Sequence, residues 1–216
     1  MFRRATLGAL VVASLAFAGL NATARASGAQ VTQDRFHGPF AEAGGEKTTP
    51  TSITDLATLA SQEQDGTTHL SIVDLHTTYL DSGGNVTGSV DVSGELNSGA
   101  SFTMDTVGLS TASASGAVPV TRCTFDAAGN PTGCTSGTMD VSMTWTGQGA
   151  ISRGKEWVDH SVDPGGLTFV DRGIGTFRQA SATATIGNET FDGSDLQIAD
   201  FGVANGLTVT ICPHGC

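Results

Sequence analysis

Two segments of the chain share the pattern D-x-x-G-N-x-T-G, at residues 81–88 and 126–133. Each is followed by a second shared piece, G-x-x-D-V-S, at residues 88–93 and 137–142. Aspartate, asparagine and glycine tolerate the unusual backbone dihedrals of tight turns. Because apolar and polar residues alternate on both sides of each turn, the repeat predicts two antiparallel β-hairpins of the same kind.

The first hairpin has a register that separates apolar from polar side chains. Its predicted apolar face pairs Thr77 with Val90, Leu75 with Val92, and Val73 with Gly94. Its predicted polar face pairs Thr78 with Ser89, His76 with Asp91, and Asp74 with Ser93. A slip of one residue would move every side chain to the other face and destroy this separation.

The second hairpin has an equally constrained register. It pairs small residues with large ones: Val118 with Met139, Gly116 with Val141, Ala114 with Met143, and Ala112 with Trp145. The same register places Cys123 directly opposite Cys134, within reach of a disulfide bond.

The rest of the chain predicts an all-β fold, an antiparallel sandwich or small barrel of roughly nine or ten short strands. Further strands are expected at residues 36–43, 56–62, 102–109, 167–170, 177–186, 196–203 and 207–212. Residues 53–62 also fit a helical period, but Asp65-Gly66 follows closely and favours a strand. One helical turn is an alternative for residues 155–160. Residues 27–52 are expected to be poorly ordered or an edge strand, and residues 53–216 a single β domain.

The first 26 residues have the three parts of a secretory signal peptide. Two arginines precede an uncharged apolar run from Ala5 to Leu20, and Ala24-Arg25-Ala26 provides a cleavage site. Cleavage after Ala26 would remove three arginines and change the formal net charge of −11 to −14. A chain with that charge repels phosphate backbones, so nucleic acid is not an expected partner. No membrane span is expected in the mature chain.

The chain has four cysteines, and an even number in a secreted protein predicts disulfides. If Cys123 pairs with Cys134, then Cys212 and Cys216 are left to close a small C-terminal loop. Their C-x-x-x-C spacing differs from that of redox-active and zinc-binding motifs. We therefore expect a structural bond there and no cofactor.

Several residues are candidates for chemistry, although the chain contains none of the familiar catalytic motifs. The first group is the polar face of the first hairpin, Asp74, His76, Asp91 and Ser93, where the pair of His76 with Asp91 could bind a metal or orient an imidazole. The simpler interpretation of the first group is a solvated sheet face with a weak cross-strand ion pair.

The second group is the segment from Glu156 to Asp163, where three carboxylates, including Asp159, could line a sugar or cation site together with His160 and Trp157. The simpler interpretation of the second group is Trp157 in the core with solvated charges around it.

Calcium binding is a further hypothesis, because calcium prefers oxygen ligands on flexible loops. Its candidates are Asp192 and Asp195, with Asp126 and Asn130 as a second set. Neither stretch has the full EF-hand pattern, and the same residues are common in turns.

Three functional classes follow from these patterns. The favoured class is a secreted, non-catalytic β domain that binds an unidentified extracellular ligand or surface partner. The alternatives are a secreted β-barrel hydrolase or isomerase that uses acidic residues and histidine, and an extracellular calcium-binding module. An outer-membrane barrel is disfavoured because it needs girdles of Tyr and Trp, and the chain has one Tyr and two Trp.

Overall fold

A computed structural model of the chain describes residues 24–26, 29–162 and 168–212. Throughout these ranges the regular secondary structure is β-strand, which confirms the predicted all-β class. The strands are β1 (Ala24–Ala26), β2 (Ala29–Thr49), β3 (Ser52–Gln62), β4 (Thr68–Leu80), β5 (Val86–Leu96), β6 (Ser101–Met104), β7 (Thr111–Asp126), β8 (Pro131–Gly147), β9 (Ser152–Val162), β10 (Thr168–Ile186), β11 (Glu189–Phe191) and β12 (Ile198–Cys212).

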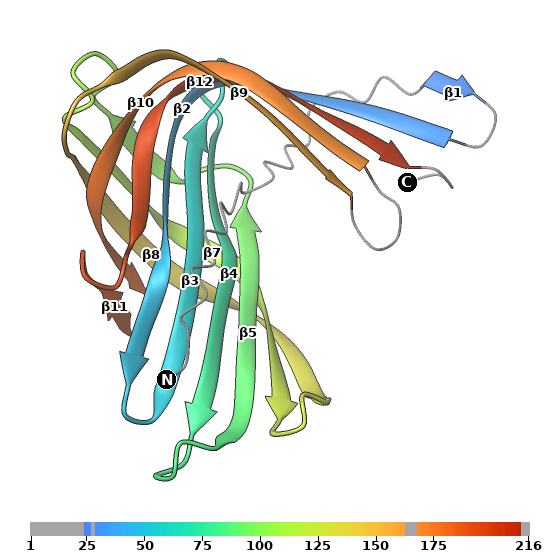
Figure 1. Cartoon of the computed structure of the whole chain (residues 1–216), viewed down its shortest axis with the longest axis vertical. Helices are drawn as coiled ribbons and strands as arrows, with labels where there is room; N and C mark the ends of the chain where they lie inside the picture. The colour runs from blue at the N-terminus through green and yellow to red at the C-terminus, as the bar shows by residue number, and fades with distance from the viewer. Residues whose placement is uncertain (1–23, 27–28, 163–167, 213–216) are drawn as a thin grey trace, which may run out of the picture.

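The strands form one antiparallel sheet that closes into a barrel (Figure 1). The order around the barrel is β2-β12-β10-β8-β7-β5-β4-β3, and pairing of β3 with β2 closes it. β6 adds to β7, β11 and β9 add to β10, and β1 adds to β2. Closure leaves no open edge among the barrel strands themselves.

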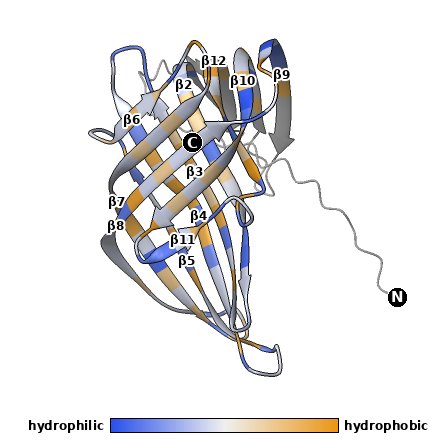
Figure 2. Ribbon diagram, turned by 90° about the vertical axis from the view of Figure 1, so that its left-hand side faces the viewer, coloured by the Kyte–Doolittle hydropathy of each residue, from blue (hydrophilic) through white to orange (hydrophobic). Residues whose placement is uncertain are grey.

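Hydrophobic and hydrophilic residues alternate along many of the barrel strands (Figure 2). The buried hydrophobic residues form one main cluster in the interior of the barrel. The largest members of this core are Trp145, Phe191 and Phe201, which are almost fully buried. Many of the others are alanines, including Ala41, Ala114 and Ala182. Small and large residues therefore alternate across the interior, as a narrow eight-stranded barrel requires.

Trp145 connects opposite parts of the barrel wall. Its indole Nε1 donates a hydrogen bond of 2.8 Å to the backbone carbonyl of Glu42. Trp145 lies on β8 and Glu42 on β2, and both β10 and β12 lie between them in the sheet order.

The predicted registers of both hairpins are confirmed over most of their length. Thr77 pairs with Val90, Leu75 with Val92 and His76 with Asp91 in the first, and the second follows the prediction from Ala112–Trp145 to Cys123–Cys134. The two hairpins are adjacent, because β5 pairs with β7.

The expected pairing of Val73 with Gly94 is wrong. A β-bulge between Ile72 and Leu75 lets Ile72 pair with Gly94 instead. Ile72 consequently points into the core, and Val73 is pushed to the surface with 42% of its area exposed. The predicted pairing of Asp74 with Ser93 is lost for the same reason, since Asp74 falls within the bulge.

The two D-x-x-G-N turns use identical hydrogen bonds. Asp81 Oδ1 accepts from the backbone N–H of Gly83 and of Asn85, and Asp126 Oδ1 accepts equivalently from Ala128 and Asn130. The glycine before each asparagine has a positive φ, 79° at Gly84 and 81° at Gly129, which a residue with a side chain seldom adopts.

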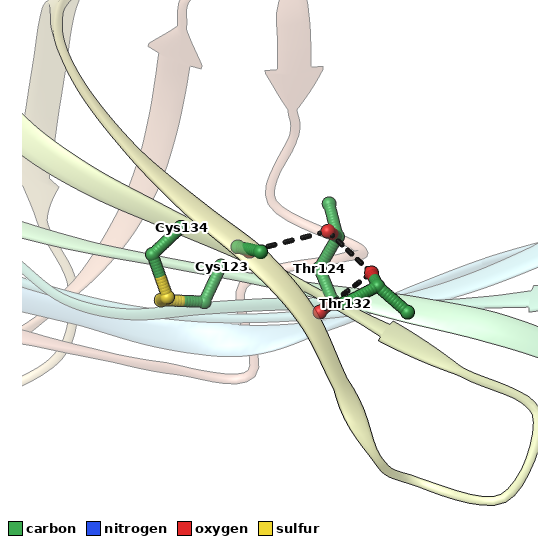
Figure 3. Close-up of a disulfide and its surroundings, with 5 residues drawn as sticks. Cys123, Thr124, Thr132 and Cys134 are labelled. Carbon is green, nitrogen blue, oxygen red and sulfur yellow. Dashed lines mark hydrogen bonds between the residues drawn. A yellow bond between two sulfur atoms is a disulfide. The ribbon is translucent and has the colours of Figure 1, made fainter.

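Cys123 and Cys134 form a disulfide across the second hairpin, as the register predicts (Figure 3). Closer to the turn, the hydroxyls of Thr124 and Thr132 lie 2.7 Å apart. This cross-linked arm is exposed over residues 131–138. The predicted partner of Cys212, Cys216, lies outside the described residues.

Several strands are longer than expected. The strands expected at residues 167–170 and 177–186 are parts of one strand, β10, which begins at Thr168, and those expected at 196–203 and 207–212 are parts of β12, which begins at Ile198. The helical turn considered for residues 155–160 is wrong, because β9 occupies this segment and pairs with β10. Residues 53–62 are a strand, as predicted.

Four strands continue past the barrel as a sheet extension (upper right in Figure 1). β3 pairs with β2 only from Phe40 onward, and β8 pairs with β10 only from Ala180 onward. Before these points β2 and β10 pair with β12, and β9 takes the place of β8 beside β10. We define the sheet extension as these parts of β2, β12 and β10 together with β9.

Candidate functional site

A row of ionisable side chains crosses the outer surface of four neighbouring strands. Glu46 on β2 pairs with Asp55 on β3, Asp55 pairs with His76 on β4, and His76 pairs with Asp91 on β5. Leu56 and Leu75, next to two of these residues in the sequence, point into the core, so the row faces outward. Asp74, two residues before His76, extends the row.

His76 is held between two partners. Its Nδ1 contacts Asp91 Oδ1 in a very short ion pair, and its Nε2 lies 3.0 Å from Thr78 Oγ1. The contact with Asp91 is the cross-strand pair that the sequence predicts, and Thr78 follows because residues two apart share a face.

The order Asp91–His76–Thr78 resembles the carboxylate, imidazole and hydroxyl of a nucleophilic triad. A triad also needs N–H donors directed at the developing oxyanion. Thr78 pairs with Ile53 on one side and with Ser89 on the other. The backbone N–H and C=O groups around Thr78 are therefore engaged in sheet pairing. Within the described residues, the arrangement has no N–H donors directed at the position that an oxyanion would occupy.

Two carboxyl groups on this surface, Asp55 and Asp74, have raised pKa values. Partial burial, followed by the charge of Glu46, raises the pKa of Asp55 above its ordinary value, and His76 opposes this effect. Partial burial also raises the pKa of Asp74, again against the opposing effect of His76. Both groups would be stabilised as anions by an additional positive charge.

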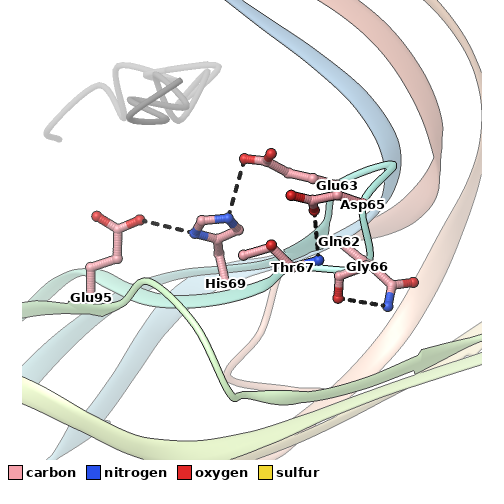
Figure 4. Close-up of polar contacts among 7 residues, drawn as sticks. All are labelled: Gln62, Glu63, Asp65, Gly66, Thr67, His69 and Glu95. Atoms are coloured by element: carbon pink, nitrogen blue, oxygen red, sulfur yellow. Dashed lines mark hydrogen bonds and ion pairs between the residues drawn. The ribbon is translucent and has the colours of Figure 1, made fainter. Parts of the chain in front are cut away.

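A second histidine lies between two glutamates near the other end of β4 (Figure 4). His69 Nε2 is 3.2 Å from Glu63 Oε1, and His69 Nδ1 is 3.8 Å from Glu95 Oε1. Burial raises the pKa of Glu95, and His69 acts in the opposite direction. His69 pairs with Ser61 on β3, so this cluster is on the same outer face as the row.

We call this surface of β2–β5 the acidic face; it consists of Glu46, Asp55, Glu63, His69, Asp74, His76, Asp91 and Glu95. Among the described residues, every ion pair has a histidine as its cation. The carboxylates of the acidic face are therefore not neutralised by a lysine or arginine of the described chain.

A pair of carboxyl groups lies beside the acidic face. Glu42 on β2 and Asp200 on β12 are direct cross-strand partners, and their side chains share a hydrogen bond. Burial, then the charge of Asp200, raises the pKa of Glu42 to about 8. Burial also raises the pKa of Asp200, although the hydrogen bond from Glu42 and the charge of Lys155 lower it. Glu42 is accordingly the protonated partner and donates to the Asp200 carboxylate.

Asp159 and His160, the other catalytic candidates, lie on β9 and pair with Asp171 and Val170. β9 pairs with β10, which is not a neighbour of β4 or β5. The structure therefore does not bring these two residues into the row that contains His76 and Asp91.

The metal candidates Asp192 and Asp195 form a turn. Asp192 Oδ1 accepts hydrogen bonds of 2.8 Å and 2.5 Å from the N–H and hydroxyl of Ser194, and Asp195 Oδ2 accepts from the N–H of Asp192. The Asp126 carboxylate is similarly used by its own turn. In the part of the chain that the structure describes, no cluster of His, Cys, Asp or Glu has an arrangement that could hold a metal ion.

Sequence patterns did not identify Glu42, Asp200 or the His69 cluster. Glu42 and Asp200 meet only because β2 pairs with β12, strands at opposite ends of the chain. His69 meets Glu95 across β4 and β5 beyond the bulge, where the predicted register no longer applies.

Comparisons with known proteins identify no relative. No protein-family model, no curated protein and no solved structure matches the chain.

The described part of the chain contains no helix that is long and apolar enough to span a membrane.

Proposed function

We propose that the chain is a secreted, non-catalytic β domain that binds a positively charged partner through its acidic face. The observation that supports this proposal most directly is the concentration of carboxylates on the outer surface of β2–β5, none paired with a lysine or arginine of the described chain. Two of them, Asp55 and Asp74, have raised pKa values, so binding of a cation relieves an existing unfavourable interaction.

The chemistry of the partner follows from the shape of this surface. The carboxylates are spread over four strands at intervals of about 5 Å, the spacing of neighbouring strands. Such a row suits several amino or guanidinium groups of a basic peptide or protein better than one metal ion, which needs converging ligands. The acidic face repels nucleic acid, as the net charge predicts.

Binding of a lysine homopeptide, measured by titration calorimetry at low ionic strength, tests the proposal. We expect binding that weakens with added salt, because exposed charges are screened. Asp55→Asn with Asp74→Asn should weaken it several-fold, since an exposed ion pair contributes up to about 1 kcal/mol. Acidification should weaken binding already above the usual carboxyl range, because protonation removes the charge of groups with raised pKa.

Asp140→Asn with Glu189→Gln is the matched control, because both residues are exposed and lie on β8 and β11. It removes the same charge from other strands and should leave peptide binding nearly unchanged. Equal weakening by both double variants would show that net charge alone attracts the peptide and would contradict a defined site.

Export from the cytoplasm is the second part of the proposal, and the disulfide supports it because such bonds persist in oxidising compartments. We expect the protein recovered outside the cytoplasm to begin at Ser27, measured by intact mass. Cleavage after Ala26 removes β1, which pairs only with β2, and leaves the barrel strands unchanged. Recovery of a full-length chain with Met1 would contradict export through this signal.

A further inference from the structure

The sheet extension carries a surface with two exposed arginines, Arg35 and Arg172, and one exposed carboxylate, Glu156, whereas the acidic face has no lysine or arginine. Several residues that continue the inner face of the barrel into the extension are exposed, and Leu207 is half-buried. Val158, Arg172, Leu207 and Arg35 are consecutive cross-strand partners on β9, β10, β12 and β2. Both arginines are exposed, and 76% of Val158 is exposed.

Neighbouring residues make this surface partly apolar. Ile174, two residues after Arg172, has 46% of its area exposed. It pairs with Glu156 on β9 and with Asn205 on β12, and Asn205 pairs with His37 on β2. Arginine with exposed aliphatic side chains is a composition typical of protein interfaces. We call Arg35, His37, Val158, Arg172, Ile174 and Leu207 the extension surface.

The extension surface and the acidic face match in spacing as well as in charge. Arg35 and Arg172 lie on the two strands that flank Leu207. Asp55 and Asp91 lie on the two strands that flank His76. In both rows the charged residues are two strands apart, about 10 Å. Two guanidinium groups of one molecule can therefore face two carboxylates of another at the same time.

The bulge at Val73 adds an apolar contact to the acidic face. Val73 is exposed beside Asp74, so this face also offers an aliphatic side chain next to its carboxylates. It corresponds to Val158 and Ile174 on the extension surface. A bulge that re-aims a side chain is a recurrent feature of functional sheet surfaces.

We infer that the chain associates with a second copy of itself, in which the extension surface of one copy binds the acidic face of the other. This rests on the proposed function, because it names the positively charged partner of the acidic face. The two surfaces differ, so a single contact is heterologous, and reciprocal use of both surfaces is needed for a closed dimer.

Sedimentation velocity of the mature protein tests the inference. At low salt we expect concentration-dependent association that half-molar sodium chloride reverses. Arg35→Glu and Arg172→Glu should each weaken association at least tenfold, because a like charge then faces Asp55 or Asp91. Arg122→Glu, the same charge change on the exposed hairpin arm, should not. A chain that stays monomeric at millimolar concentration in low salt overturns the inference.

A charge swap provides the second measurement. The Asp55→Arg, Asp91→Arg chain and the Arg35→Asp, Arg172→Asp chain should each fail to self-associate, and their mixture should associate again. A mixture that stays monomeric, with both chains folded by circular dichroism, also overturns the inference. The proposed function is tested separately, by the lysine homopeptide. If the wild-type chain binds this peptide but stays monomeric, the acidic face is still a binding site for cations, and only the inference that a second copy is its partner is contradicted.

Discussion

Trp145→Ala is expected to lower the free energy of unfolding by about 3–5 kcal/mol, the range for a large aromatic residue removed from a core. Trp145 is 1% exposed and belongs to the main hydrophobic cluster of the barrel. The substitution would also remove the hydrogen bond to the Glu42 carbonyl, which joins two non-adjacent parts of the wall. A loss of this size is a large fraction of the 5–15 kcal/mol that stabilises a typical domain.

Two further variants separate the causes of this loss. Trp145→Phe keeps most of the buried volume and removes the indole donor, so we expect a smaller loss of about 1–3 kcal/mol. Thr144→Ala, at the next position on β8, affects an exposed hydroxyl that contacts Thr183 and should change stability by no more than about 0.5 kcal/mol. Urea denaturation followed by far-ultraviolet circular dichroism measures all three. A loss from Trp145→Ala that is no larger than that from Thr144→Ala would contradict the central role of the indole.

The local parts of the fold were predictable from the sequence. The two hairpins have short turns with strong dihedral preferences, and one register alone keeps their apolar residues on one face. The disulfide between Cys123 and Cys134 and the contact between His76 and Asp91 follow from these registers. Both contacts join residues that are close in the sequence.

The bulge at Val73 and Asp74 was not predictable from the alternation pattern, because Val73 is as apolar as the residues around it. The bulge places Ile72 opposite Gly94, and Gly94 also contacts a third strand. Gly94, opposite Ile72, lies so close to β7 that a Cβ atom there would be 2.1 Å from the Pro119 carbonyl oxygen. This contact exists only after β5 has paired with β7, which the hairpin pattern does not specify.

Glycines also caused two long strands to be predicted as four short ones. Gly173 and Gly206 interrupt the apolar pattern, but they are cross-strand partners within continuous strands. Glycine allows close backbone approach as well as turns. A Cβ atom on Gly202 would lie 2.2 Å from the Thr176 carbonyl oxygen, so the pairing of β10 with β12 needs glycine there.

The carboxyl pair of Glu42 and Asp200 depends on pairing between strands that are far apart in the sequence. Glu42 lies between two alanines that point into the core, which predicts only that its side chain faces outward. The pairing of β2 with β12 places Asp200 beside it. The chemical consequence, a carboxyl group that keeps its proton at neutral pH, arises from burial and from this neighbour together.

Glu42→Gln is expected to change the pH dependence of stability. The pKa of Glu42 is about 8 in the folded chain and about 4.5 in the unfolded chain, so the folded state binds a proton that the unfolded state has released in this interval. The contribution of Glu42 to stability is therefore fully present below about pH 4.5, declines as the pH rises, and is lost above about pH 8. Glutamine stays neutral and can still donate a hydrogen bond to Asp200, so the variant should not show this decline.

The expected difference is on the order of 3–5 kcal/mol over that interval, since each pKa unit corresponds to about 1.4 kcal/mol. Other groups around the carboxyl pair also influence the free energy of unfolding. Lys155 on β9 favours the Asp200 carboxylate, whereas Gln179 and Leu59, the cross-strand neighbours of Asp200 and Glu42, are uncharged. Because these residues are the same in both proteins, the difference between wild type and variant isolates Glu42.

Urea denaturation of both proteins at intervals between pH 5 and pH 9 measures this effect. We expect Glu42→Gln to gain stability relative to wild type as the pH rises and to be the more stable protein at pH 9, where wild type carries two adjacent carboxylates. Glu189→Gln is the control, because Glu189 is exposed and lies on β11, away from the pair; its curve should run parallel to wild type. If the Glu42→Gln curve also runs parallel to wild type, Glu42 is ionised in the folded protein and the two carboxyl groups do not share a proton.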